Sequence, residues 1–157
     1  MHLPAIHHPE TQETRSHDDP RNMTTLVTGA TGFVGAAVVR ALLARGDKVR
    51  VLRRSHSPNA NIDGLEIETV TGDLTEPESL NAAITGCSDL FHVAADYRLW
   101  AKNPAVLYRT NVDGTEALMR AALKAGVRRI TYTSSVATLG NPGDGTPGSE
   151  ATPVTEA

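Results

Sequence analysis

Three glycines spaced three residues apart constrain this chain more than any other feature. Gly29, Gly32 and Gly35 lie in the segment TGATGFVG at 28–35, directly after the apolar run 25–27. A dinucleotide-binding turn needs this pattern. The first glycine allows a tight turn out of a strand, the second lets the backbone approach a pyrophosphate, and the third lets the next helix pack closely.

The amides at the start of that helix would face the anion with the positive end of the helix dipole. We therefore predict a strand–turn–helix unit that binds a nucleotide, in preference to a purely structural glycine turn. The residues assigned to the cofactor in this segment are Gly29, Thr31, Gly32, Phe33, Val34 and Gly35.

The sequence from residue 23 onwards alternates between strand and helix patterns. Strands are predicted over 24–28, 48–53, 65–71, 89–94 and 128–134, and helices over 32–45, 76–85 and 104–125, with a loop between the second and third strands. A capping box at 75–78 with a proline predicts the start of the second helix. Helical spacing predicts that the first helix buries Phe33, Val34, Ala37, Val38, Ala41 and Leu42.

Strands that alternate with helices form right-handed crossovers and a parallel sheet. The sequence thus predicts an α/β fold, a Rossmann-type doubly wound sheet with strand order 3-2-1-4-5. Ligands of such sheets bind at the carboxyl ends of the strands, where the order reverses. The residues expected there, beside the glycine turn, are Arg53, Asp73, Leu74, Ala94, Ala95 and Ser135.

The residue at the end of the second strand predicts the cofactor. An NAD site usually has an acid there, about 20 residues past the glycines, to bind the ribose 2′-hydroxyl. This chain has Arg53 and Arg54, and a guanidinium suits the 2′-phosphate of NADP. We predict NADP over NAD, the alternative being that both arginines are ordinary surface charges.

Asp73 and Leu74 follow the third strand, where a carboxylate can accept a hydrogen bond from the adenine amino group and the Leu74 amide can address the ring. For Asp73 alone, an Asx-type turn or a lead-in to the helix is a serious alternative.

Composition excludes several other classes of protein. The net charge is -3 and no basic cluster stands out, so a nucleic-acid partner is not expected. No apolar run approaches the roughly 20 residues of a membrane span. The single cysteine, Cys87, cannot form an internal disulfide and is predicted to be a packed residue in a cytoplasmic protein.

Residues 1–22 have a different composition from the rest of the chain. They contain four histidines and almost no apolar periodicity, so we predict a disordered tail and no metal site. The predicted globular part is therefore 23–157.

Several further motifs resemble those of the extended short-chain dehydrogenase/reductases. Besides the glycine segment they are GDL at 72–74, HVAA at 92–95, NVDGT at 111–115 and YTSSVAT at 132–138. The resemblance covers residues 23 to about 154. Within this family, the sequence is similar to the NAD-dependent epimerases and dehydratases and to the dihydroflavonol-reductase-like enzymes. The segment 94–100 most resembles the hopanoid-associated sugar epimerases.

The resemblance implies hydride transfer between a nicotinamide and a carbinol carbon of a small-molecule substrate, such as a sugar nucleotide or a ketone. It implies that Ser135 binds the substrate oxygen as a catalytic residue, that a tyrosine and a lysine handle the proton, and that the full-length parent is a homodimer. His92 is expected to be a packed strand residue and not a base.

The family's Tyr-x-x-x-Lys pair is not found in this sequence. Residues four positions after Tyr97, Tyr108 and Tyr132 are alanine, valine and valine, and no tyrosine follows Ser135. We therefore expect a Rossmann domain that is incomplete at its C-terminal end, before the substrate subdomain, and inactive alone. The alternatives are a non-catalytic NADP-binding sensor and an inactive fragment.

Overall fold

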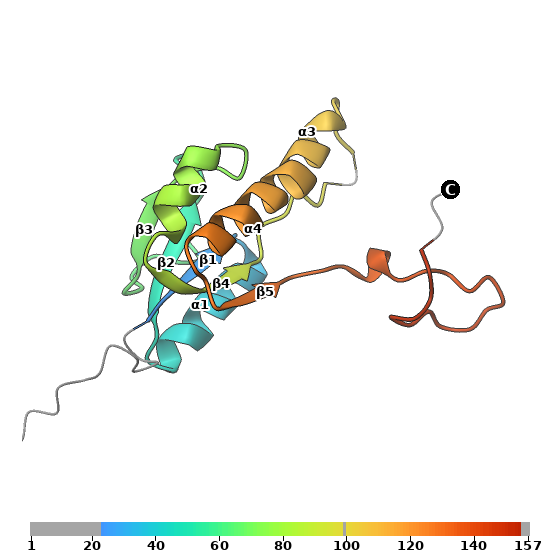
Figure 1. The fold of residues 1–157 in the computed structure, drawn as a ribbon, viewed down its shortest axis with the longest axis horizontal. Helices are drawn as coiled ribbons and strands as arrows, with labels where there is room; N and C mark the ends of the chain where they lie inside the picture. Colours follow the sequence, from blue (N-terminus) through green and yellow to red (C-terminus); the bar gives the residue numbers. More distant parts are fainter. Residues whose placement is uncertain (1–22, 99, 155–157) are drawn as a thin grey trace, which may run out of the picture.

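The computed structural model describes residues 23–98 and 100–154. Its centre is a parallel sheet of five strands in the order β3-β2-β1-β4-β5, as predicted (Figure 1). The strands are β1 (Thr24–Thr28), β2 (Lys48–Arg53), β3 (Glu68–Thr71), β4 (Cys87–His92) and β5 (Arg129–Tyr132). The prediction of a disordered tail falls on residues 1–22, outside the described residues.

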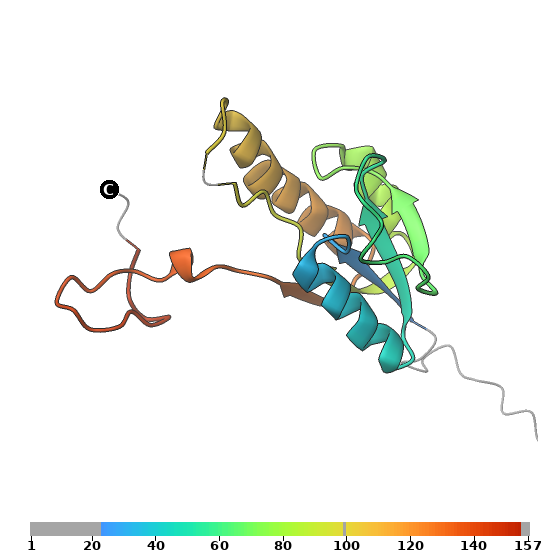
Figure 2. The same cartoon turned by 180° about the vertical axis from the view of Figure 1, so that it is seen from behind.

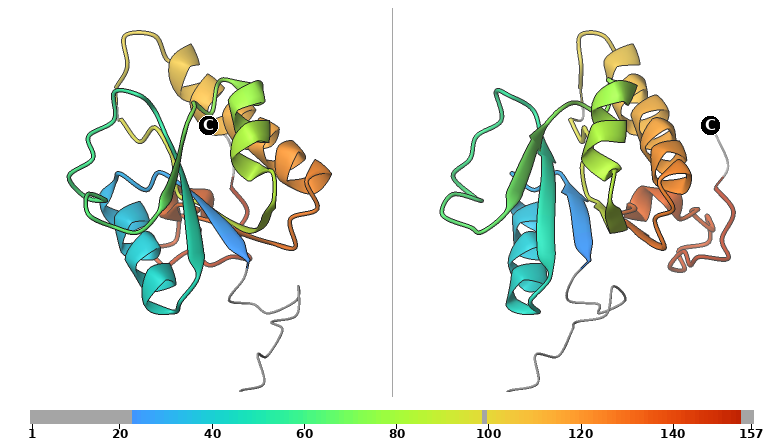
Figure 3. Two further views of the ribbon diagram at one scale, coloured as in Figure 1. Left: turned by 90° about the vertical axis from the view of Figure 1, so that its left-hand side faces the viewer. Right: turned by 60° about the vertical axis from the view of Figure 1, so that its left-hand side comes forward.

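Helices lie on both faces of the sheet, so the doubly wound architecture is confirmed. The helix α1 (Phe33–Ala44) covers one face, and α2 (Pro77–Ile84) and α4 (Gly114–Lys124) cover the other, as Figure 3 shows. Side chains alternate along β1, so that Leu26 belongs to the core under α2 and α4 while Val27 belongs to the core under α1. This alternation lets a central strand that is buried from Thr25 to Thr28 hold both layers together.

The first helix buries a face that overlaps the predicted one only at Leu42, with Val38 partly buried beside it. Its buried residues are Gly35, Ala36, Val39 and Leu42, whereas Phe33 is 90% exposed. Apolar residues occur nearly all round this helix, so periodicity alone did not select a face. The small residues Gly35 and Ala36 permit the closest approach to the sheet, and they decide which side turns inward.

The predicted helix over 104–125 is interrupted. It consists of α3 (Ala105–Tyr108), one π-helical turn, η2 (Arg109–Asp113), and α4. Strands β3, β4 and β5 also differ from prediction, and β5 is shorter at both ends, Arg129–Tyr132 instead of 128–134. The third strand begins later, at Glu68, and β4 begins earlier, at Cys87, directly after Gly86 with its φ of +76°.

The predicted capping box is wrong, although Pro77 does stand at the first position of α2. The residue at the helix cap is Glu76, and no side chain caps the helix. The Thr75 hydroxyl instead donates to Oδ1 of Asp73 at 2.7 Å.

The last described segment leaves the body of the domain. After β5 the chain runs away from the sheet through a short turn, η3 (Val136–Thr138), in both Figure 1 and Figure 2. Strand β5 is the outer strand on this side, with Ile130 and Tyr132 exposed by 42% and 52%. Apolar side chains on an outer strand leave a surface suited to further packing.

Candidate cofactor site

The glycine turn connects β1 to α1 with the geometry that an anion site needs. Gly29 has a φ of +71°, and the Gly32 amide donates to the Gly29 carbonyl at 3.0 Å, which closes the turn. No side chain caps the start of α1, and its first turn contains no acid. The helix dipole and the first amides are therefore unopposed by any negative side chain of this helix.

Two of the three glycines are required by close packing within the turn. A Cβ on Gly29 would lie 2.7 Å from the Ala94 amide nitrogen, and a Cβ on Gly35 would overlap the Gly29 carbonyl group. Gly32 differs, because its Cβ would meet only the Gly29 oxygen, at 3.3 Å, and the residue is exposed. The backbone at Gly32 is thus open to a ligand while Gly29 and Gly35 lock the turn.

The loop between β2 and β3 holds the turn from outside. Asn61 donates its side-chain amide to the Thr31 carbonyl at 2.8 Å, and Arg40 of α1 donates to the Asn61 carbonyl at 2.7 Å. Ile62, only 6% exposed, packs in the core under α1. The connection is a loop, as predicted, but its hold on the glycine turn has no motif by which the sequence could have indicated it.

Arg53 ends β2 with an unneutralised charge. Its guanidinium donates to the backbone carbonyls of Arg54 at 3.4 Å and Ser55 at 3.1 Å. Within the described part of the chain, no carboxylate pairs with it. A guanidinium held only by neutral carbonyls keeps its capacity to bind an anion.

Asp73 follows β3 and forms the Asx-type turn that was the alternative for this residue. Its Oδ1 accepts from the Thr75 amide at 2.8 Å and from the Thr75 hydroxyl at 2.7 Å. Partial burial acts to raise the pKa of Asp73, but these hydrogen bonds outweigh it and hold the pKa below its usual value. Leu74 is buried in the core, which leaves its backbone as the part that could meet a ligand.

The end of β4 is joined to the end of β1 by one hydroxyl. Oγ1 of Thr28 accepts from the amides of Val93 at 3.3 Å and Ala94 at 3.2 Å, while Ala95 is exposed. His92 is fully buried, as expected of a packed residue, and burial lowers its pKa to about 4. Cys87 at the other end of β4 is buried as predicted, and burial raises the pKa of its thiol.

The loop after Ala95 is fixed by the π-helical turn. Asn111 of η2 accepts from the Asp96 amide at 2.7 Å and donates to the Asp96 carbonyl at 2.8 Å. This pair of bonds orients a loop on which Tyr97 and Trp100 are 90% and 78% exposed. Asn111 stood in the NVDGT motif, but only the structure shows what its amide does.

Ser135 is placed apart from these contacts. It is exposed, and its Oγ accepts from the Ala137 amide at 3.2 Å, which caps η3. In the described part of the chain, no hydrogen bond joins Ser135 to the glycine turn.

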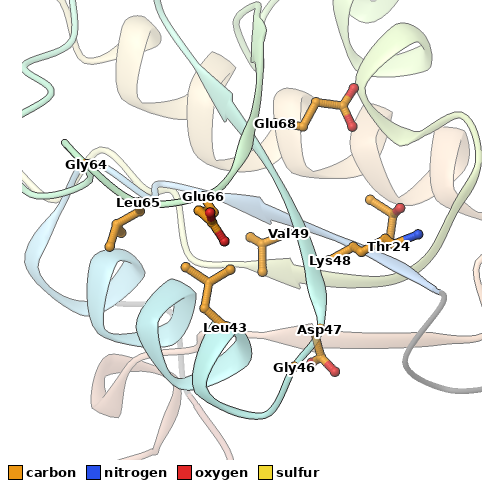
Figure 4. Close-up of a pocket in the computed structure, with 10 residues that line it drawn as sticks. All are labelled: Thr24, Leu43, Gly46, Asp47, Lys48, Val49, Gly64, Leu65, Glu66 and Glu68. Atoms are coloured by element: carbon orange, nitrogen blue, oxygen red, sulfur yellow. The ribbon is translucent and has the colours of Figure 1, made fainter.

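The hollow drawn in Figure 4 does not belong to the cofactor site. It measures about 590 Å³ and is lined by Thr24, Lys48 and Glu68, the first residues of β1, β2 and β3. Ligands of doubly wound sheets bind at the opposite, carboxyl ends. Over residues 23–98 and 100–154 there is no helix long and apolar enough to cross a membrane, and no cluster of side chains that could hold a metal ion.

Comparison with known proteins agrees with this geometry. A Synechocystis protein provisionally named dihydroflavonol 4-reductase is 51% identical over 119 residues, which is 76% of this chain and 34% of the relative. A crystal structure of gox2253 has a TM-score of 0.79 and 54% identity, covering 85% of this chain and 41% of that chain. The chain thus spans about a third of the length of the curated relative.

A third comparison carries a cofactor. The crystal structure of a short-chain dehydrogenase/reductase superfamily protein from Agrobacterium tumefaciens with bound NAD has a TM-score of 0.63 and 37% identity, covering 73% of this chain and 33% of that chain. The model of the NAD dependent epimerase/dehydratase family matches residues 25–157. With the glycine turn, the strand order and these matches in agreement, the chain belongs to the NAD dependent epimerase/dehydratase family.

Proposed function

We propose that this chain is the dinucleotide-binding part of an oxidoreductase or epimerase that acts by hydride transfer on a sugar nucleotide or a ketone. The observation that supports it best is the uncapped start of α1 behind the Gly29 turn, with no acid in its first turn. That arrangement fits a pyrophosphate, which Gly32 and the first amides of α1 would bind. Ala94 and Ala95 would border the same cofactor at the end of β4. The nicotinamide, when bound, accepts or supplies the hydride.

We further propose that NADP is the preferred cofactor. Arg53 lies where an NAD-binding relative would hold an acid, and its guanidinium has only neutral carbonyl partners among the described residues. The 2′-phosphate of NADP would give it a charged partner, whereas the 2′-hydroxyl of NAD would not.

Exchanging the charge at residue 53 tests this preference. We expect the wild-type chain to bind NADPH more tightly than NADH, and Arg53→Asp to shift the ratio of the two affinities towards NADH by at least about tenfold, or about 1.4 kcal/mol. Dissociation constants for both nucleotides, measured by fluorescence titration, give the ratio.

A matched control separates the effect of the charge at residue 53 from the effect of the net charge of the chain. Arg120→Asp changes the net charge equally on α4, where Arg120 is 77% exposed and, among the described residues, pairs with Glu116 alone. It should leave the NADPH-to-NADH ratio unchanged. Equal affinities of the wild-type chain for the two nucleotides would show that Arg53 does not select the cofactor.

We propose that the proton-transfer pair, most substrate contacts and the dimer contacts of the parent lie outside these 157 residues, and that Ser135 binds the substrate oxygen only in the whole enzyme. General acid–base catalysis is worth roughly a hundred- to ten-thousand-fold in rate. The chain is therefore expected to show no turnover of ketones or sugar nucleotides with NADPH. A rate of NADPH oxidation proportional to protein and abolished by Ser135→Ala would overturn this.

A further inference from the structure

One buried side chain connects four elements at the cofactor edge of the sheet. His92 is the last residue of β4 and has no exposed surface. Its Nδ1 lies 2.7 Å from Oγ1 of Thr28 on β1, and its Nε2 lies 3.0 Å from Oγ1 of Thr115 on α4. Its ring stacks on Tyr132 of β5, with the ring centres 5.3 Å apart.

The hydrogen bonds around Thr28 determine which tautomer His92 adopts. The Thr28 oxygen already accepts from the amides of Val93 and Ala94. Its own proton is therefore the one that can be shared with His92, so Nδ1 accepts and the ring carries its proton on Nε2, which donates to Thr115. One neutral tautomer thus pairs both ring nitrogens of His92 and the Thr28 hydroxyl.

This group lies directly behind the proposed cofactor contacts. Thr28 precedes Gly29, and a Cβ on Gly29 would lie 2.7 Å from the Ala94 nitrogen, so the glycine turn rests on the backbone at Ala94. The Thr28 hydroxyl thus contacts His92 on one side and the Val93 and Ala94 amides on the other, next to the glycine turn. On the far side, Thr115 follows Gly114, which packs against Leu74 so closely that a Cβ there would lie 2.9 Å from the Leu74 Cβ.

We propose that His92 is a positioning residue of the dinucleotide site, which acts through Thr28 to hold the glycine turn and the Ala94–Ala95 segment in their binding arrangement. It does not itself touch the cofactor. The inference rests on the proposed function for its purpose, but the arrangement it describes exists in the free protein and can be tested there.

Two variants at this position distinguish a positioning role from a packing role. If His92 positions the site, the variant that disturbs the site more is His92→Phe, whereas the variant that loses more packing is His92→Asn. His92→Phe keeps a ring to stack on Tyr132 but removes both hydrogen bonds. His92→Asn loses the ring and leaves a cavity, yet its amide oxygen can still accept from Thr28. Both lose the bond to Thr115, so the Thr28 contact is the polar difference between them.

The experiment uses the full 157-residue chain. Nitrogen-15 NMR of the free wild-type protein should show His92 as the neutral Nε2–H tautomer. The amide signals of residues 29–35, 94 and 95 should move further in His92→Phe than in His92→Asn, and NADP affinity should fall about tenfold in His92→Phe, with most of it retained in His92→Asn. Urea unfolding should give the reverse order of stability loss, with His92→Asn the less stable.

An Nδ1–H tautomer in the wild type would overturn the positioning role. So would larger amide shifts and a larger loss of NADP affinity in His92→Asn than in His92→Phe, because His92 would then be a core histidine only. If wild-type protein bound neither NADP nor NAD, the proposed function would fail, while the tautomer and the amide shifts would still decide the role of His92. If His92→Phe did not fold, the wild-type tautomer and the shifts in His92→Asn would decide it.

Discussion

Replacing Gly35 with alanine is expected to destabilise the domain by about 3 kcal/mol or more, because a single added carbon has nowhere to go. The Cβ would lie 2.6 Å from the Gly29 carbonyl carbon and 2.9 Å from the Ala30 Cα, and both neighbours are backbone atoms. To make room, α1 would have to separate from the turn, and the buried contacts of Val39 and Leu42 would loosen with it. Equilibrium unfolding in urea measures the loss.

Two glycines that flank the same helix, Gly32 before it and Gly46 after it, provide the comparison. Gly46 follows α1 with a φ of +88° and has open space around its Cβ position, so Gly46→Ala should cost only the strain of a left-handed alanine, about 1 kcal/mol. Gly32→Ala should fold nearly as well as wild type but bind dinucleotide more weakly, because its Cβ would occupy the open approach. If Gly35→Ala were no less stable than Gly46→Ala, the close packing of the turn would be refuted.

The sequence predicted the architecture well because its signals were local and repeated. Strands β1 and β2 begin and end at the predicted residues, and the strand order follows from the alternation of strands and helices. The errors occurred where tertiary contacts override local pattern. Leu65 and Ile67 pack against the core under α1 before β3 begins to pair, so the strand is shorter than its apolar run. The π-helical turn has no periodic signal, because its apolar positions look like those of an uninterrupted helix.

The features of the candidate site likewise divide into those that local sequence predicts and those that depend on tertiary contacts. The glycine turn was predictable because its three glycines are adjacent in sequence and each has a backbone reason. Asn61 and Thr115 were not predictable, because their hydrogen bonds join residues 30 and 23 positions apart. His92 was expected to be packed, which is confirmed, but its bond to Thr28 spans 64 positions and depends on the pairing of β1 with β4. The cofactor roles of Arg53 and Asp73 and the substrate-oxygen role of Ser135 stay predictions.

The buried histidine gives the second large effect, on stability against acid. Burial lowers the pKa of His92 from 6.5 to about 4 in the folded chain, whereas the unfolded chain has the ordinary pKa. Between these values the unfolded state binds a proton that the folded state does not, so stability is full above about 6.5 and falls as the pH drops towards 4.

Acidification through this window should therefore cost about 3 kcal/mol of unfolding free energy from His92 alone. Asp73 and Asp89 contribute to the pH dependence of stability only at lower pH. Burial acts to raise the pKa of each, but hydrogen bonds from Thr75 and from Arg129 outweigh it, so each pKa lies below its ordinary 3.8 and their stabilisation is lost only as the pH falls further.

Urea unfolding of wild type and His92→Phe at a series of pH values from 7 to 4.5 isolates the histidine, since every other titrating group is common to both. The wild type should lose stability more steeply than His92→Phe, which has no proton to bind at this position. Parallel slopes for the two proteins would mean that His92 takes up its proton equally in the folded and the unfolded wild type. That result is incompatible with a neutral, buried ring between Thr28 and Thr115.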